Sequence, residues 1–297
     1  MRKLLQERAR LLATIRTFFR SKNILEVETP ILSRAGVCDP HLQNLNTYVN
    51  SRRFFLQTSP EFAMKRLLSA GSGDIYQIGK AFRNDEAGRL HNPEFTMIEW
   101  YRTGFDYRQL MDEVEELVSI LLPVKDFERV TWREVYLRAT GIDPMQVSTE
   151  ELKTMVGEVA GQTSRQDLLD LIMAVKVLPA LPGAVFIHDY PVDQASMAKI
   201  RDGIAERFEL VIDGVELANG YTELTDPFEQ EQRFRYENQQ RRIMGKEEMP
   251  LDQHLLEAMQ KGLPECAGVA MGFDRLVMLA LGKQSLAEVM PFTAEFA

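Results

Sequence analysis

The stretch that says most about the fold is residues 74–102, which read DIYQIGKAFRNDEAGRLHNPEFTMIEWYR. Residues 74–84 and 94–102 both have the composition of strands, and a polar loop from Asp85 to Pro93 separates them. These segments predict a long β-hairpin. Because side chains alternate along a strand, one face of its second strand carries Phe95, Met97, Glu99 and Tyr101.

A carboxylate and a phenol in the middle of an apolar strand have two interpretations. They lie either on an exposed sheet face that carries a stray charge, or on a face that binds a ligand. Arg83 ends the first strand, and the loop holds Arg89, His91 and Asn92. Such a cluster could clamp a polyphosphate.

A second pattern lies at residues 208–217, where Asp213-Gly214 is a strong signal for a two-residue hairpin turn. With that turn, Glu209 lies opposite Ala218, and Glu209 and Glu216 share one face about 7–8 Å apart at Cα. Two carboxylates at this range could bind Mg²⁺ that is bridged to substrate phosphates. The alternative is a solvated hairpin with two surface glutamates.

A third pattern is the run of small residues from Gly268 to Gly272, followed by a helix whose first turn holds Arg275. Small residues let a ligand approach a buried strand closely, and the start of a helix attracts anions. Ordinary packing is an equally open explanation of this run when it is taken alone.

The rest of the chain predicts one α+β domain over residues 1–297, with an antiparallel sheet flanked by helices. A helix is expected at 4–19, and a strand at 24–30 that Pro30 ends. Another helix is expected from Ser59 as N-cap, with Pro60 as its first residue, to about Ala70. The remaining expectations are a strand at 52–58, helices at 106–122, 228–245 and 274–281, strands at 184–189, 207–218 and 266–271, and a small helical insertion at 148–180.

The composition excludes several classes of protein. There are 44 acidic and 35 basic residues, a formal net charge of −9, which counts against a broad nucleic-acid-binding surface. Cys38 and Cys266 are too few for a disulfide framework or a zinc site. We see no targeting segment and no apolar run of the roughly 18 residues that a membrane span needs. A reducing cytoplasm is the expected location.

The first and third of these patterns, together with the strand region before Pro30, resemble the three motifs of class II aminoacyl-tRNA synthetases in the same order. Motif one matches residues 25–32, motif two matches 82–86 and 91–101, and motif three matches 272–275. The strings at 91–96 and 216–220 resemble the lysyl-tRNA synthetase branch, and the resemblance covers nearly the whole chain. Motif one begins near residue 20, which leaves no room for an anticodon-binding OB-fold. The chain therefore most resembles the stand-alone paralogues that ligate β-lysine to elongation factor P.

This resemblance implies an ATP-dependent ligase that makes an aminoacyl-adenylate with Mg²⁺ as cofactor. Arg83 and Arg275 would be catalytic, and Glu209 and Glu216 would bind the metal. The implied ATP-binding residues are Arg83, Asn84, Asp85, His91, Asn92, Phe95, Glu216, Leu217, Gly272 and Arg275, with adenine between Phe95 and Arg275. The implied amino-acid-binding residues are Ser59, Pro60, Glu61, Glu99, Tyr101, Asn219, Glu223 and Ala270, with Tyr101 and Glu223 on the side-chain ammonium.

The implied partners are elongation factor P, (R)-β-lysine or lysine, and a second copy of the chain, paired through residues 20–35. The final residues, 291–297, lack the basic ending of the family. One alternative is a lysyl-tRNA synthetase-like enzyme that charges tRNA, although tRNA is an unlikely acceptor at this net charge. The other is a non-catalytic paralogue that senses an amino acid, which is disfavoured because Arg83, Glu209, Glu216 and Arg275 are all present.

Overall fold

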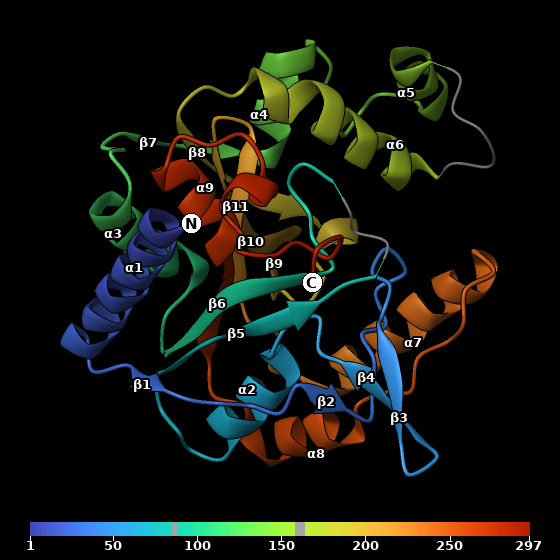
Figure 1. Ribbon diagram of the computed structural model, residues 1–297. Helices are drawn as coiled ribbons and strands as arrows, with labels where there is room; N and C mark the ends of the chain where they lie inside the picture. The colour runs from blue at the N-terminus through green and yellow to red at the C-terminus, as the bar shows by residue number, and fades with distance from the viewer. Residues whose placement is uncertain (85–87, 158–163) are drawn as a thin grey trace.

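The fold is organised around one large sheet (Figure 1). The computed structural model describes residues 1–84, 88–157 and 164–297. The strands run in the order β1-β5-β6-β12-β11-β10-β8-β7, and β9 pairs with β10. Their bounds are β1 Leu25–Glu26, β5 Ile75–Phe82, β6 Glu94–Thr103, β7 Phe127–Thr131, β8 Ala184–Pro191, β9 Ile200–Arg201, β10 Ile204–Ile212, β11 Val215–Thr222 and β12 Cys266–Gly272.

The centre of this sheet is antiparallel, as the sequence predicts, and its two ends are not. The predicted hairpin is formed by β5 and β6, which pair antiparallel from Ile75–Tyr101 to Phe82–Glu94. In contrast, β1 pairs parallel with β5, and β7 pairs parallel with β8. Both parallel pairs are joined by long crossovers that contain helices, as parallel strands require. The predicted fold class is therefore confirmed, with an antiparallel centre and one parallel pair at each end of the sheet.

One face of the sheet is covered by α1 Arg2–Ser21, α3 Tyr107–Leu121 and α9 Phe273–Ala280, with which it forms the main hydrophobic core. Ile98 and Trp100 of β6 point into this core and are fully buried. The alternation of the strand therefore turns Glu99 and Tyr101 to the opposite face. The Trp100 indole N–H donates to the buried Glu113 on α3 at 3.0 Å.

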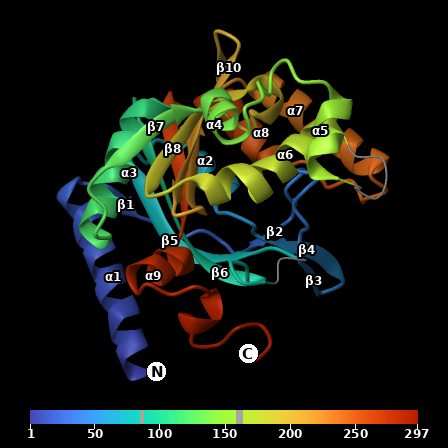
Figure 2. The same cartoon turned by 90° about the horizontal axis from the view of Figure 1, so that it is seen from above.

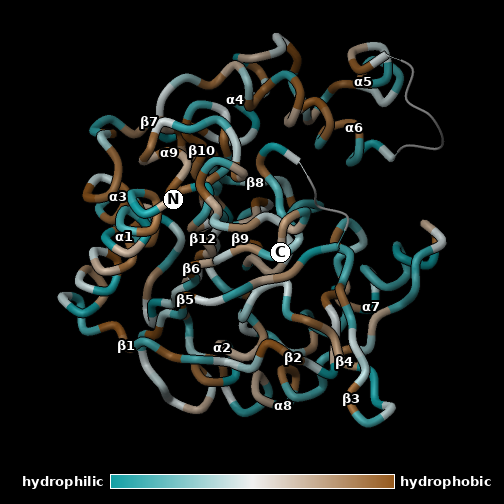
Figure 3. Tube along the Cα trace, viewed as in Figure 1, coloured by the Kyte–Doolittle hydropathy of each residue, from teal (hydrophilic) through white to brown (hydrophobic). Residues whose placement is uncertain are grey.

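The opposite face meets a second layer, which consists of a small sheet and three helices. The sheet contains β2 Leu32–Ser33, β3 Asn46–Val49 and β4 Arg52–Leu56, and the helices are α2 Glu61–Ser69, α7 Pro227–Ile243 and α8 Gln253–Gly262. Residues of α2, α7 and α8 share a hydrophobic cluster with Tyr101 and Cys266 of the large sheet. Figure 3 shows α7 as mainly hydrophilic, which agrees with the charged helix that the sequence predicts.

Two of the predicted element boundaries are wrong. The strand expected at 24–30 is only two residues long, because just Leu25 and Glu26 pair with β5 before the chain leaves the sheet. The second helix begins at Glu61 with Pro60 as N-cap. The Ser59 hydroxyl accepts a hydrogen bond from the Glu61 backbone amide at 3.0 Å. It also donates to Glu99 at 2.7 Å, so it links the start of α2 to the face of the large sheet.

A third hydrophobic cluster lies beside β7 and β8 and includes helices at the top of Figure 1, which face the viewer in Figure 2. They are α4 Trp132–Thr140, α5 Thr149–Val156 and α6 Arg165–Ile172, followed by helical turns at 173–180. Helices α5 and α6 lie within the expected insertion. Helix α4 belongs to the same cluster although it lies earlier in the sequence, and neither it nor α8 was predicted.

Candidate active site

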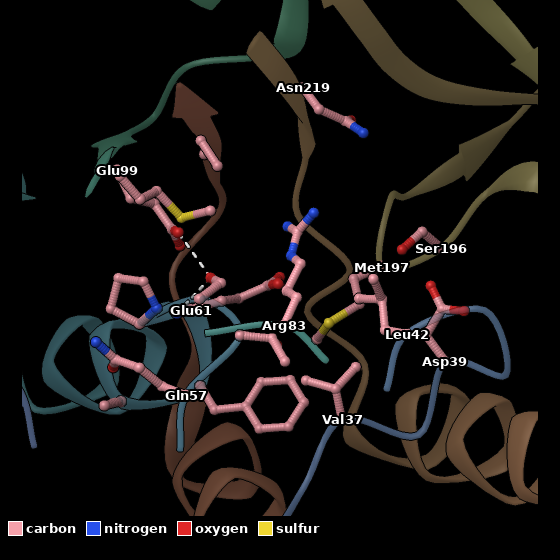
Figure 4. A pocket seen from close by; sticks show the side chains of 18 of the residues that line it. Val37, Asp39, Leu42, Gln57, Glu61, Arg83, Glu99, Ser196, Met197 and Asn219 are labelled. Carbon is pink, nitrogen blue, oxygen red and sulfur yellow. Dashed lines mark hydrogen bonds between the residues drawn. The ribbon is translucent and has the colours of Figure 1, made fainter. Parts of the chain in front are cut away.

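One cavity of about 790 Å³ lies between the two layers, over the face of β6, β11 and β12 that carries Glu99 and Tyr101. Figure 4 shows Glu61, Arg83, Glu99 and Asn219 arranged around this space, although they come from different elements. Most of the predicted site residues line it: Ser59, Pro60, Glu61, Arg83, His91, Asn92, Phe95, Glu99, Tyr101, Glu216, Leu217, Asn219, Glu223, Ala270, Gly272 and Arg275. Asn84 and Glu209 do not line it, and Asp85 lies outside the described residues.

One end of the cavity is a buried acidic cage around Glu99. The Tyr101 hydroxyl donates to Glu99 Oε1, and the Ser59 hydroxyl donates to Oε2, each at 2.7 Å. Burial raises the pKa of Glu99 to about 7, and the nearby charge of Glu61 acts in the same direction. Charges taken out of water need compensation, so this carboxylate favours a cationic ligand.

Lys65, which was not among the predicted site residues, is a buried cation at the same end. Its Nζ lies 2.7 Å from Glu61 Oε1 and 2.5 Å from Glu223 Oε2, and the Lys65 side chain is fully buried. The Tyr221 hydroxyl, also not predicted, donates to Glu61 Oε1 at 2.8 Å. The spacing of four residues between Glu61 and Lys65 was a signal for this pair once residues 61–69 were predicted as a helix.

The two carboxylate oxygens of Glu223 differ in their partners, because only Oε2 forms the ion pair with Lys65. The Glu223 side chain is fully buried, and Oε1 has no hydrogen-bond partner among the described residues. Burial raises the pKa of Glu223 to about 8. Gly268 keeps space beside this oxygen, because a Cβ there would lie 2.4 Å from Glu223 Oε1 and 2.3 Å from the Tyr101 ring.

The other end of the cavity carries the residues expected to hold a nucleotide. The Arg83 guanidinium carbon lies 5.3 Å from the centre of the Phe95 ring. Arg275 donates to the Glu216 carbonyl at 2.7 Å, and its Nη2 lies 2.9 Å from His91 Nε2. Arg275 therefore links the second half of the predicted hairpin loop to β11, and both arginines line the cavity.

Two residues, Asp274 and Asn92, hold the neighbouring elements in place. Arg8 of α1 forms an ion pair of 2.7 Å with Asp274, the residue before Arg275. The other Asp274 oxygen accepts from the Thr96 amide at 2.7 Å. Asn92 accepts from the Ala294 amide at 3.0 Å and donates to the Glu94 carbonyl, which ties the loop to the C-terminal segment.

The predicted register of the β10–β11 hairpin is wrong beyond its turn. Ile212 pairs with Val215 and Val211 with Glu216, as expected, but the register then shifts, and Glu209 lies opposite Asn219 rather than Ala218. This irregularity places one extra residue on β11, as in a β-bulge. Glu209 Oε1 accepts hydrogen bonds from the Arg207 guanidinium at 2.5 Å and from the side-chain amide of Asn219 at 3.3 Å.

The pair Glu209 and Glu216 fits a divalent cation only as a partial ligand set. Burial raises the pKa of Glu209, Arg207 lowers it, and the negative charge of Glu216 raises it further, so the two carboxylates repel each other. In the described part of the chain, no group of three or more acidic, His or Cys side chains is arranged to hold a metal ion by itself. Mg²⁺ prefers a few carboxylates completed by phosphates and water, and this pair suits that arrangement.

The fold and this bipartite cavity define a class II synthetase catalytic domain. The chain belongs to that class: the family described as tRNA synthetases class II (D, K and N) matches residues 1–295. Enzymes of this class use ATP. No helix within the described ranges is both long and apolar enough to cross a membrane.

The nearer relatives identify the branch within this class. The elongation factor P--(R)-beta-lysine ligase of Vibrio cholerae is 46% identical over 97% of this chain and 94% of its own length. The proteins of the same name from Pseudoalteromonas translucida and Photorhabdus laumondii are 46% and 45% identical, again over 97% of this chain and 94% of their own lengths. The chain belongs to this family of ligases.

Proposed function

We propose that this protein activates (R)-β-lysine, and lysine more weakly, with ATP and transfers it to the ε-amine of a specific lysine on elongation factor P. The observation that carries the proposal is one cavity with an acidic cage at one end and arginines at the other. An amino acid with two ammonium groups suits the cage, and ATP suits the arginines. The names of the relatives support this acceptor.

In the first step, a carboxylate oxygen of the amino acid bonds to the α-phosphorus of ATP, and the bond to the bridging oxygen breaks to release pyrophosphate. Arg83 stabilises the charge that develops on the α-phosphate. Phe95 and Arg275 hold adenine between them by stacking and by a cation–π contact. Mg²⁺ bound by Glu209 and Glu216 would offset the charge of the phosphates. Asn84, Asp85, His91, Asn92, Leu217 and Gly272 complete the nucleotide site in this proposal.

In the second step, the ε-amine of the acceptor lysine attacks the acyl carbon. AMP leaves with the electron pair of the C–O bond, and the amine loses a proton as the amide forms. Ser59, Pro60, Glu61, Glu99, Tyr101, Asn219, Glu223 and Ala270 hold the amino acid through both steps. These roles demand positioning and electrostatic stabilisation more than a general base.

The amino-acid specificity follows from charge. Glu61, Glu99 and Glu223 bring three carboxylates to the cage. In this proposal, Tyr101 and Glu223 bind the side-chain ammonium of the substrate. A neutral side chain would leave Glu223 without a cation for its second oxygen, and buried unpaired groups are costly. We therefore infer strong selection for a diamino acid.

The acceptor is tested by comparing transfer from the adenylate to elongation factor P and to tRNA(Lys). The net charge of −9 opposes binding to a polyanion, so we expect transfer to the protein acceptor and little to tRNA. Equal transfer to both would favour a tRNA-charging enzyme. Pyrophosphate exchange without any transfer would contradict the proposed acceptor, and the absence of exchange would favour an amino-acid sensor. Because the acceptor is a translation factor, we infer a cytoplasmic enzyme.

A further inference from the structure

Lys65 has an unusual position for a lysine, because its whole side chain is buried beside the amino-acid end of the cavity. Its ammonium contacts Glu61 at 2.7 Å and Glu223 at 2.5 Å, and lies 5.7 Å from the centre of the Tyr221 ring. The Glu61 and Glu223 side chains line the cavity, whereas Lys65 lies behind them. An ammonium is rarely buried unless it is paired, so these contacts account for its burial.

We propose that Lys65 is a positioning residue for the amino-acid substrate, and that it acts through Glu223. The inference rests on the proposed function and extends it by naming the group that orients the substrate-binding carboxylate. Lys65 holds Glu223 Oε2, and Oε1 has no hydrogen-bond partner among the described residues. Glu223 can therefore offer Oε1 to the side-chain ammonium of the substrate without rotating.

The charges of the cage support the same role. Glu61, Glu99 and Glu223 are three carboxylates, and Lys65 supplies one positive charge against them. A lysine-type substrate brings two ammonium groups, while its own carboxylate points to the nucleotide. The occupied cage is then electrically balanced only if Lys65 is present. Without it, the pKa of Glu223 would rise further, and the carboxylate would bind an ammonium less strongly.

The test is a double-mutant cycle with Lys65→Met, Glu223→Gln and the double variant, assayed by pyrophosphate exchange with (R)-β-lysine and ATP. If Lys65 acts through Glu223, Lys65→Met raises KM for the amino acid by about tenfold or more and leaves KM for ATP within about twofold. The double variant should then be no worse than Glu223→Gln alone. Lys65→Arg keeps the charge and should recover part of the affinity.

Lys153→Met is the matched control, because Lys153 forms an exposed ion pair of 2.9 Å with Glu150 on α5. It should leave both KM values unchanged. If Lys65→Met does not fold, the double variant removes both buried charges together and is compared directly with Glu223→Gln. In that comparison, equal KM values support the inference.

Three results would overturn the inference: additive effects of the two substitutions on KM, an unchanged KM in Lys65→Met, or tighter amino-acid binding in that variant. The last would mean that Lys65 competes with the substrate for Glu223. If the wild-type protein gives no exchange with any diamino acid, the proposed function fails and the inference fails with it. If the wild-type protein gives exchange but the effects of the two substitutions on KM are additive, the role of Lys65 is refuted and the proposed function stands.

Discussion

Ala270 lies directly opposite Glu99 in the register between β12 and β6. On its other side it lies opposite Asn219 of β11, and all three residues line the cavity. In the lysyl-tRNA synthetases that this strand resembles, the position of Ala270 is usually glycine. The Ala270 methyl group is therefore an addition to the floor of the proposed amino-acid site.

We predict that Ala270→Gly raises the rate of activation of α-lysine relative to β-lysine by at least several-fold. In β-lysine the amine nearest the carboxylate lies one carbon further away, so a methyl beside the α-carbon would crowd the α-isomer more. One methyl group in a pocket is worth about 1–3 kcal/mol. Pyrophosphate exchange with both isomers measures the ratio. An unchanged ratio would mean that other residues select the isomer.

We predict that Glu216→Gln abolishes adenylate formation and preserves the fold. The Glu216 side chain is 41% exposed, so little stability depends on it, whereas the loss of one charge weakens the proposed metal site. Pyrophosphate exchange over a Mg²⁺ titration measures activity, and thermal unfolding measures the fold. Glu150→Gln, at an exposed position of α5, is the control. Wild-type exchange by Glu216→Gln would refute the metal assignment.

We predict that the amino acid binds more tightly as pH rises through the range in which Glu99 and Glu223 ionise. Their pKa values are raised by burial to about 7 and about 8, so the empty cage holds protons at neutral pH. A diammonium ligand favours the ionised carboxylates, and its binding should release protons. KM for the amino acid should fall between about pH 6 and pH 8.5, while KM for ATP changes little.

The same shifts have the opposite effect on the stability of the ligand-free protein. Between the ordinary glutamate pKa and these raised values, the folded state binds more protons than the unfolded state. The free energy of unfolding should therefore fall as pH rises from about 5 to 8, and saturating amino acid should reduce that fall. Calorimetric binding in two buffers of different ionisation enthalpy measures the protons released. A pH-independent KM without proton release would contradict the ionised cage.

We predict a homodimer through the first strand region. β1 lies at the edge of the large sheet, and Leu25, Ile31 and Leu32 are 58%, 42% and 41% exposed. An edge strand with exposed apolar side chains is suited to pairing with a second copy. Light scattering should give twice the chain mass of 34.0 kDa at micromolar concentration. Leu25→Glu should shift the mass toward the monomer, and a monomeric wild type would refute the dimer.

Local patterns in the sequence were sufficient for the central hairpin and for the face of β6 that bears the site. Alternation along a strand depends only on backbone geometry, so Glu99 and Tyr101 could be assigned to one face from residues 94–102 alone. The Asp213-Gly214 turn was equally local, and the structure has its two flanking pairs as predicted. Further from the turn the prediction failed, because the register shift after Val211 has no signature in the turn residues.

Contacts between distant parts of the chain were decided only by the tertiary structure. The ion pair of Arg8 with Asp274 joins residues that are far apart in the sequence, and no periodicity connects them. Lys65 on an amphipathic helix could equally have faced solvent, and only the packing of α2 against the sheet makes it a buried partner of Glu223. Spacing along a chain determines which face a side chain shares, whereas burial and charge pairing depend on which elements meet across the core.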